Sequence, residues 1–529
     1  MAGVAWAQTA PAASAQTAGN AAPQSQVPTY RSSSELVVLD VIVTDAHGHP
    51  LRGLKLEDFS VAENGTAVGL HSVDDHTAGG PVLLETVPTL PKHILTNRPT
   101  AAPNDEWDVL LYDNLNTPLA AQAFANQQMQ KFLATLPPNR KVALFRLDTN
   151  LHLLSPFASG GDVIKVLTGK AAPPQVSPLL QTFSMDDYVA SHEQGMKTYM
   201  RAAITADAFV ALADWLAAYP GRKSIYWLSG SFPMVPHVEG LNAHDALLNP
   251  RPFKGMFDFT GLIKRMNNRL AAARVAVFPL DVRGVGSDHY EGIQDASTSG
   301  PVSGFGGMFQ TQADDQRVYR IDQEHAQMQA IAEATGGVAR VENNDLAAIL
   351  GDEFRVSQLY YTLSYKPVNK SLDGNFRKIK VTVHRPGTRL AYRSGYYAMP
   401  ETPSKPISAD EFTMAMRHGA PPATGVIFEL EIKPNTDHSK LVIQYKVDPA
   451  TLTLATLEGT PSAEFDCAVI AYNDKAQPLA VKQLHVHGRP PGFFAEQAMV
   501  LPTGATSLRI GVRDQATGRF GTLEVAPNN

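Results

Sequence analysis

At residues 107–117 the chain reads Trp-Asp-Val-Leu-Leu-Tyr-Asp-Asn-Leu-Asn-Thr, a mostly apolar half followed by a polar half. The run from Trp107 to Tyr112 is typical of a strand that is buried on both faces of a sheet. Residues Pro118 to Leu136 then repeat apolar side chains at helical spacing, and Pro137-Pro138 stops the helix. The stretch is therefore expected to form the first strand and helix of an α/β domain.

The same alternation of strand and helix continues toward the C-terminus. After a predicted hairpin at Asp148-Thr-Asn150 come helix Ala203–Tyr219, strand Ser224–Leu228, helix Phe259–Ala273, strand Arg274–Leu280, helix Gln323–Ala334 and helix Leu346–Ser357. Alternating strands and helices imply a mostly parallel sheet with helices on both faces. We therefore predict a doubly wound, Rossmann-like α/β domain over residues 104–357. Within it, residues 284–316 are rich in Gly, Ser, Asp and Gln and are expected to form an inserted surface loop.

Short β-branched runs flank this domain on both sides. Leu36–Val43 reads as a strand and Asn64-Gly65 as a hairpin turn, so residues 31–78 supply about three strands. Residues 358–399 supply about four more. Neither set closes a sandwich, whereas together they reach the usual number of about seven for an immunoglobulin-like fold. We therefore predict that the α/β domain is inserted into one β-sandwich formed from both flanks.

Composition divides the remaining segments. Residues 1–30 contain Ala5-Trp6-Ala7, a small-x-small pattern that signal peptidase accepts, followed by an Ala-, Gln-, Pro- and Ser-rich stretch. We expect a truncated signal remnant and a disordered linker there, and hence a protein that is secreted or held in the periplasm or cell envelope. Residues 79–103 and 400–424 read as linkers. Residues 425–529 contain five or more short strand-like runs and predict a separate, sandwich-like all-β domain.

Bulk composition limits the classes of function. A chain of 529 residues is longer than the roughly 250 to 300 residues that one hydrophobic core accommodates, so we expect several domains. The net charge of −6, with no local block of Lys and Arg, argues against a nucleic-acid partner. The sequence contains no continuous run of about 20 apolar residues, so we expect no membrane span in the mature chain. The single cysteine, Cys467, lies in an apolar run and is expected to be a buried small hydrophobe rather than a nucleophile.

A series of short motifs resembles the von Willebrand factor A-like proteins grouped as the acidobacterial VWFA-related family. The motifs are Leu39-Asp-Val-Ile-Val-Thr-Asp45, Gly53-Leu54 with Asp58-Phe59, Leu110-Leu-Tyr-Asp-Asn-Leu-Asn-Thr117, Pro220-Gly-Arg-Lys223 with Trp227-Leu-Ser-Gly230, Ala334-Thr-Gly-Gly337, Tyr360-Tyr361 with Tyr365, and Arg393-Ser-Gly-Tyr396. The resemblance covers Leu36 to Ala398. It implies the von Willebrand A fold and a role in adhesion or protein interaction. The predicted insertion of such a domain into a β-sandwich resembles the domain arrangement of integrin β chains.

The resemblance also implies a cation site of Asp-x-Ser-x-Ser type at the carboxyl ends of the parallel strands. Asp113 matches the first aspartate of that loop and Thr117 matches the last hydroxyl. The middle serine position holds Leu115, which cannot coordinate a metal, and Asn116 substitutes for it only if the loop is rearranged.

The two distant ligands of that site are also incomplete. Thr205, at the start of a predicted helix, is the candidate for the distant threonine, and Ser229 stands where the second aspartate is expected. Because Mg²⁺ requires octahedral oxygen ligands and dehydrates reluctantly, this set predicts a degenerate site with weak Mg²⁺ binding or none. The alternative is that Asp113, Asn116 and Thr117 cap the following helix without any metal.

Catalytic patterns are incomplete as well. Ser229 and Ser231 follow a buried strand as a nucleophile elbow would, but Trp227 occupies a position that requires glycine. His485-Val-His487 places two imidazoles on one face of a strand without an identifiable third ligand, so surface histidines are favoured over a zinc site. We therefore expect a binding, adhesion or scaffold protein that engages a protein partner through an acidic residue of that partner, and no catalytic residues. The alternative is an extracytoplasmic metal-dependent or hydrolytic enzyme.

Overall fold

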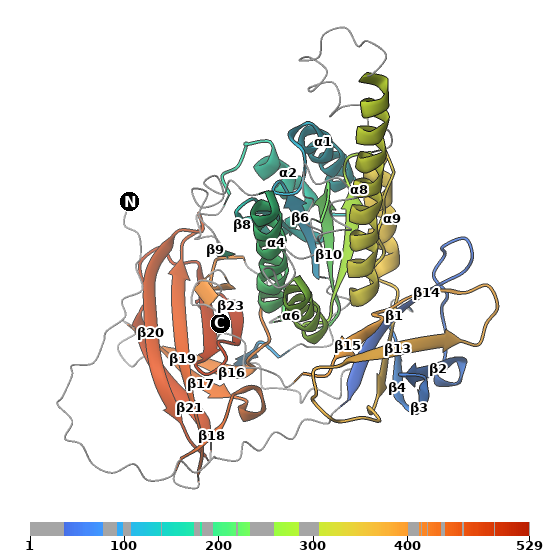
Figure 1. Ribbon diagram of the computed structural model, residues 1–529. Coiled ribbons are helices and arrows are strands. Elements are labelled where there is room, and N and C mark those ends of the chain that lie inside the picture. The colour runs from blue at the N-terminus through green and yellow to red at the C-terminus, as the bar shows by residue number, and fades with distance from the viewer. Residues whose placement is uncertain are drawn as a thin grey trace, which may run out of the picture.

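The computed structural model describes residues 36–77, 93–98, 107–138, 140–173, 180–181, 194–217, 219, 221–232, 259–284, 306–399, 412–413, 415–419, 422–434, 440–457, 460–490 and 492–527. The expected signal remnant and linker at residues 1–30 lies outside these described residues, as do residues 285–305 of the expected surface loop. Figure 1 shows an α/β domain at the top, a β-sandwich at the lower right and a C-terminal β domain at the left.

A six-stranded sheet forms the centre of the α/β domain, in the order β11-β10-β6-β7-β8-β9. Its members are β6 (Trp107–Asp113), β7 (Lys141–Leu147), β8 (Asn150–Ser159), β9 (Leu180–Gln181), β10 (Lys223–Ser229) and β11 (Val275–Asp281). The first four strands in the sheet order are parallel, whereas β8 runs antiparallel to both of its neighbours. Every residue of β6, β10 and β11 is buried, which explains why these strands read as continuous apolar runs.

Helices cover both faces of this sheet. Alternate residues of a strand point to opposite sides, so each strand contributes to the core under both layers of helices. Val109 and Leu111 of β6 share a core with α4 (Gln194–Leu216), α6 (Phe259–Ala272) and α8 (Gly306–Thr335). Leu110 and Tyr112 share the opposite core with α1 (Leu119–Thr135), α2 (Gly160–Leu167) and α9 (Leu346–Ser357). The result is a three-layer arrangement of helix, sheet and helix (Figure 1). Among the described residues, no helix combines the length and apolar character needed to cross a membrane.

Two helices begin earlier than the sequence periodicity predicts. α4 begins at Gln194 instead of Ala203, so Thr205 lies inside the helix and not at its start. α8 begins at Gly306, so residues 306–316 of the expected surface loop are helical. Both extensions contain Gln, Met and Ala, which favour helices even where no apolar stripe marks them. Gly336 follows the end of α8 with a φ of +83°, the left-handed conformation expected of a glycine after a helix.

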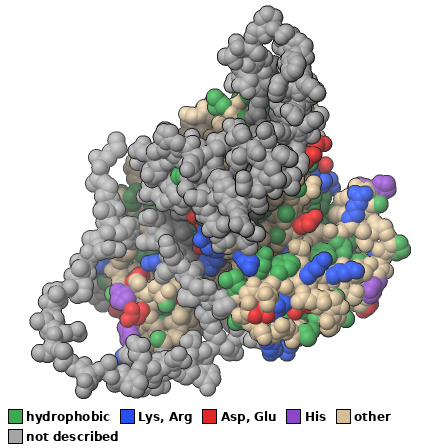
Figure 2. Space-filling view, in the orientation of Figure 1, with side chains coloured by type: hydrophobic (Ala, Val, Ile, Leu, Met, Phe, Trp, Pro, Cys, Tyr) green, Lys and Arg blue, Asp and Glu red, His purple; other side chains and the backbone are tan. Residues whose placement is uncertain are grey.

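The two flanks of the α/β domain form two four-stranded sheets together, in the orders β14-β1-β12-β4 and β15-β13-β2-β3. Their strands are β1 (Val37–Thr44), β2 (Phe59–Glu63), β3 (Thr66–Val68), β4 (Leu70–Asp75), β12 (Tyr361–Tyr365), β13 (Phe376–Val383), β14 (Arg389–Ala391) and β15 (Gly395–Tyr397), with the short 3-10 helix η1 (Leu56–Asp58) before β2. Leu39 pairs with Leu363 across the two flanks, and Val61 pairs with Val381. Each flank supplies four strands, one more than expected for the N-terminal side. On the face seen in Figure 2, the sandwich mixes acidic, basic and hydrophobic side chains.

The C-terminal domain contains β16 (Phe428–Pro434), β17 (Lys440–Val447), η2 (Pro449–Thr451), β18 (Ala455–Leu457), β19 (Thr460–Tyr472), β20 (Pro478–Gly488), β21 (Phe493–Val500), β22 (Ser507–Asp514) and β23 (Phe520–Val525). It is completed by β5 (Ile94–Thr96), which pairs antiparallel with β16. The prediction that residues 79–103 are only a linker is therefore wrong for this segment. Asn97 explains the attachment, because its buried amide donates to the carbonyl oxygens of Ala423 and Val426 and accepts from the Phe428 N–H.

Residues 400–424 also differ from a simple linker. Phe412, Met416 and Ala423 are buried in a small core with Tyr472 and Phe520 of the C-terminal domain. The sequence did not indicate this contact, because only a few apolar residues make it and the composition of the whole segment is that of a linker. The described residues within 412–423 therefore belong structurally to the domain that follows them.

Candidate ligand site at the carboxyl edge of the central sheet

Polar side chains gather where β6, β10 and β11 end. Asp113 is the last residue of β6, Ser229 the last of β10 and Asp281 the last of β11, and Ser229 pairs directly with Asp281. β6 is also where the chain order reverses, because its neighbours are β7 on one side and β10 on the other. Open α/β sheets bind ligands at the carboxyl ends of strands beside such a reversal. This edge is therefore the candidate functional site.

Asp113 lies at the centre of the first polar cluster. Its Oδ2 accepts hydrogen bonds from Asn116 Nδ2 at 2.8 Å, Trp227 Nε1 at 2.9 Å and Ser229 Oγ at 2.9 Å. Its Oδ1 accepts from the Asn116 backbone N–H at 3.0 Å. Burial raises the pKa of the Asp113 carboxyl, and the hydrogen bonds from Asn116, Trp227 and Ser229 oppose that rise.

The structure brings the five predicted site residues together. Asn116 Nδ2 also donates to Thr205 Oγ1 at 2.8 Å, although 89 residues separate the two in sequence. Thr117 Oγ1 accepts a hydrogen bond from the Gly230 N–H, directly after Ser229. All five side chains are at most 5% exposed, so an incoming partner cannot touch them without moving something else.

The helix-capping alternative does not describe these residues. Pro118 is the N-cap of α1, and that helix has no side-chain cap. Asp113 binds the backbone of Asn116 within the loop, while Thr117 binds the backbone after β10. The polar loop thus ties β6 to β10 and to α4.

A divalent cation does not fit this arrangement of donors. Three hydrogen-bond donors already point at Asp113 Oδ2, and the Asn116 N–H points at Oδ1, so neither carboxylate oxygen is free of a donor. Leu115 offers no oxygen at the middle position, and the guanidinium of Arg201 brings a positive charge to the same loop. Over the residues that the structure describes, no group of three or more His, Cys, Asp or Glu side chains is placed to hold a metal ion. Mg²⁺ needs unblocked oxygens and several waters, which these contacts do not leave.

Arg201 was not predicted from the sequence. It lies on α4, one turn before Thr205, and its Nε donates to Asn116 Oδ1 at 3.1 Å while Nη2 donates to Ser231 Oγ at 3.3 Å. Both acceptors are neutral, and within the described ranges Arg201 forms no ion pair. Arg201 is half-buried, unlike the five residues behind it. No local pattern could have identified it, because its role depends on how α4 packs beside the β6 loop.

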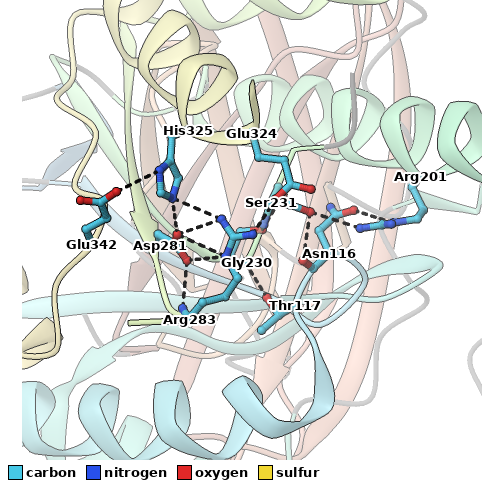
Figure 3. A network of polar contacts seen from close by, with 11 residues as sticks. Asn116, Thr117, Arg201, Gly230, Ser231, Asp281, Arg283, Glu324, His325 and Glu342 are labelled. Carbon is cyan, nitrogen blue, oxygen red and sulfur yellow. Dashed lines mark hydrogen bonds and ion pairs between the residues drawn. The ribbon is translucent and has the colours of Figure 1, made fainter. Parts of the chain in front are cut away.

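A second cluster lies beside the first, as Figure 3 shows. Arg283 donates two hydrogen bonds to Asp281, from Nε to Oδ1 at 3.0 Å and from Nη2 to Oδ2 at 2.9 Å. Its Nη1 donates to Glu324 at 2.6 Å. His325 Nε2 lies 2.6 Å from Asp281 Oδ2. Burial alone would raise the pKa of Asp281, but the hydrogen bonds from His325 and Arg283 outweigh burial and lower it. Sequence reasoning missed Asp281, although it directly follows the predicted strand Arg274–Leu280 as Asp113 follows the predicted strand Trp107–Tyr112, because Asp113 was identified from the family resemblance alone.

The other residues considered from the sequence lie apart from this edge. His485 and His487 are on the exposed side of β20, where His485 Nδ1 lies 3.0 Å from Asp466 Oδ1. Cys467 is buried in the C-terminal core, and burial raises the pKa of its thiol. Ser231 Oγ donates to the Asn116 carbonyl and has no histidine partner among the described side chains.

Comparisons with known proteins give little to build on. No protein-family model matches the chain, and no curated protein matches its sequence. Among solved structures, the chain is similar to an aerotolerance-related membrane protein from Bacteroides fragilis NCTC 9343 that carries multiple mutations to serines, with 14% sequence identity. That similarity covers 47% of this chain and 99% of the other, at a TM-score of 0.24. A similarity of this size does not establish a shared fold or function.

Proposed function

We propose that this chain is an exported von Willebrand A-like binding protein, acting in adhesion or as a scaffold, whose carboxyl-edge site engages an acidic group of a protein partner. The sheet order and the helices on both faces support a doubly wound domain of that type. The shared sheets of the two flanks support its insertion into a sandwich. The sequence motifs and the export-like N-terminal residues support the family and the location.

The observation that carries the proposal is the position of Arg201. Its half-buried guanidinium donates to Asn116 and Ser231, and both of these partners are neutral. The positive charge of an arginine with neutral partners is not compensated, so it can still attract an anion. The planar guanidinium also matches the geometry of a carboxylate, which no other side chain of the cluster does as well. In this proposal Arg201 supplies the positive charge that a cation supplies in a complete metal site, so binding needs no Mg²⁺.

Turnover is less well supported than binding. His325 Nε2 faces Asp281 and Arg283, and its Nδ1 lies 3.9 Å from Glu342. In the described part of the chain neither ring nitrogen of His325 contacts a hydroxyl or a thiol, and Ser229 donates to the buried Asp113. A hydrolytic role needs a nucleophile within hydrogen-bond reach of a base.

The proposal is tested with peptide arrays that pair each acidic peptide with its Asn- or Gln-substituted counterpart. We expect the full chain to retain acidic peptides selectively, and Arg201→Gln to weaken this binding about tenfold or more because a charged hydrogen-bonded contact is lost. Arg355→Gln, at an exposed arginine on α9, serves as the matched control. Equal retention of acidic and amide peptides would contradict the proposal. Turnover in a broad hydrolase panel that Ser229→Ala abolishes would replace it with the enzymatic alternative.

A further inference from the structure

A small pocket lies at the opposite edge of the central sheet, between the α/β domain and the sandwich. It is lined by Val38 and Asp40 of β1, by Arg393 after β14, and by Arg222, Ala271, Arg274, Val275, Ala276 and Thr335 of the α/β domain. Its free volume is about 20 Å³, which is enough for one guest of about the size of a water molecule.

The walls of this pocket carry more positive than negative charge. Three guanidiniums and one carboxylate line it, so their charges sum to +2. Asp40 is already bound by Arg274, with Nε at 3.2 Å from Oδ2 and a shorter contact through Nη2. Asp108 and Glu353 act on Arg222 from a distance and Asp74 acts on Arg274, but none of these three carboxylates lines the pocket.

The remaining two arginines are held in place by neutral groups. Arg222 is 8% exposed and donates to the carbonyl oxygens of Ser357 at 2.7 Å and Gly336 at 3.2 Å. Arg393 donates from Nη2 to the Val38 carbonyl at 2.8 Å, while its buried Nε has no hydrogen-bond partner among the described residues. A buried N–H of a charged group without a partner is costly, so such a group normally has one.

The neighbouring lysine responds to the same excess of charge. Lys223 follows Arg222 and donates to the Ala273 carbonyl at 2.8 Å. Burial, together with a smaller contribution from repulsion by Arg274, lowers the pKa of Lys223 to about 7, while Asp40 acts in the opposite direction. Arg274 is therefore close enough to Lys223 for the two positive charges to repel each other.

We propose that this pocket binds a single small inorganic anion, with chloride the best match to its size. The anion would accept a hydrogen bond from Arg393 Nε and reduce the net charge of the lining from +2 to +1, between guanidiniums that the α/β domain and the sandwich contribute from opposite sides. Because Arg222 and Arg274 belong to one domain and Arg393 to the other, the bound anion holds the two together. The proposal is independent of the carboxyl-edge site, which lies at the other end of the same strands.

Chloride-35 NMR of the full chain tests the pocket directly, since bound chloride broadens the signal in proportion to the occupied sites. We expect excess broadening that saturates with chloride and is lost in Arg393→Met, which keeps an unbranched side chain out to about the position of Nε and removes the guanidinium and its charge. Arg385→Met, at an exposed arginine of the same sandwich, should leave the broadening unchanged. Orthophosphate added as a competitor distinguishes the source: displacement of chloride would show that the arginines also accept an oxyanion.

Thermal unfolding supplies a second readout that does not depend on one variant folding. At constant ionic strength, replacing gluconate by chloride should raise Tm by roughly 3 °C at about ten times the dissociation constant. Asp40→Asn removes the carboxylate that the described residues contribute to the pocket wall and should tighten chloride binding, so it remains informative if Arg393→Met does not fold. Identical Tm values in chloride and gluconate, or broadening that persists in Arg393→Met, would overturn the proposal.

Discussion

Trp227 donates its indole N–H to Asp113 at 2.9 Å, so an aromatic side chain of β10 occupies one acceptor position of the carboxylate at the end of β6. The same ring packs edge-on against Phe209 and Phe232. Trp227 therefore joins the hydrophobic core to the polar loop, and its N–H helps to close the oxygen that a metal would otherwise use.

Replacing Trp227 with Phe should destabilise the chain by about 1–3 kcal/mol, because a buried acceptor loses one partner and the smaller ring leaves space. Urea unfolding measures the effect as a lower midpoint. Trp215→Phe is the matched control, because Trp215 is also buried but its indole N–H has no hydrogen-bond partner in the described structure. Equal losses for both variants would show that packing, and not the bond to Asp113, explains the change.

Magnesium should bind weakly or not at all to the purified chain, because Asp113 Oδ2 already accepts three hydrogen bonds and Arg201 places a cation beside Asn116. Isothermal titration calorimetry is the measurement. A micromolar dissociation constant that disappears in Asp113→Ala would mean that the loop rearranges into another coordination scheme. The Arg201→Gln variant tests the charge contribution, since removing the guanidinium should make any weak cation binding stronger.

Acid should weaken the fold through Asp281. Its folded pKa lies below the ordinary value for an aspartate, so the unfolded chain binds the proton more readily. The stabilisation is fully present above the unfolded pKa and is lost as pH falls through the folded one. Unfolding midpoints measured from about pH 5 downward should therefore fall less steeply in Asp281→Asn than in the parent chain. Asp352→Asn, at an exposed aspartate, should keep the parent slope.

Asn97→Ala should loosen the C-terminal domain. The Asn97 side chain makes three hydrogen bonds to backbone groups of residues 423–428, and it is 4% exposed. Losing them leaves buried backbone groups without partners, which costs about 2–4 kcal/mol. Limited proteolysis should then cut near β5 and β16 sooner than in the parent. Unchanged cleavage rates would show that the pairing of β5 with β16 is sufficient without the amide.

Local patterns were sufficient for most individual elements. The apolar run at residues 107–112 became β6, and the glycine after α8 ends that helix. Asn64-Gly65 connects β2 and β3 with positive φ at both residues, as the predicted hairpin requires. These features follow from side-chain burial and backbone sterics within a few residues, which a single sequence displays directly.

Residues that act across long sequence separations were different. Asp113, Asn116, Thr117, Thr205 and Ser229 were proposed as one site only because a family resemblance linked them, and the structure joins them through hydrogen bonds. Arg201 and the Asp281–Arg283–His325 cluster had no such guide, and the motif that contains Trp227 did not indicate its hydrogen bond to Asp113. Their roles depend on which helix packs beside which strand end, and composition does not encode that.

The pairing of β5 with β16 is the clearest case. Ile94-Leu-Thr96 is too short to read as a strand, and its partner lies more than 300 residues later. A three-residue strand is stable only when a sheet edge and a side chain such as Asn97 receive it, so its conformation is set by the assembled C-terminal domain. The periodicity of one segment shows which of its side chains are buried. Which distant strand or helix packs against those side chains is decided by the tertiary structure of the whole chain.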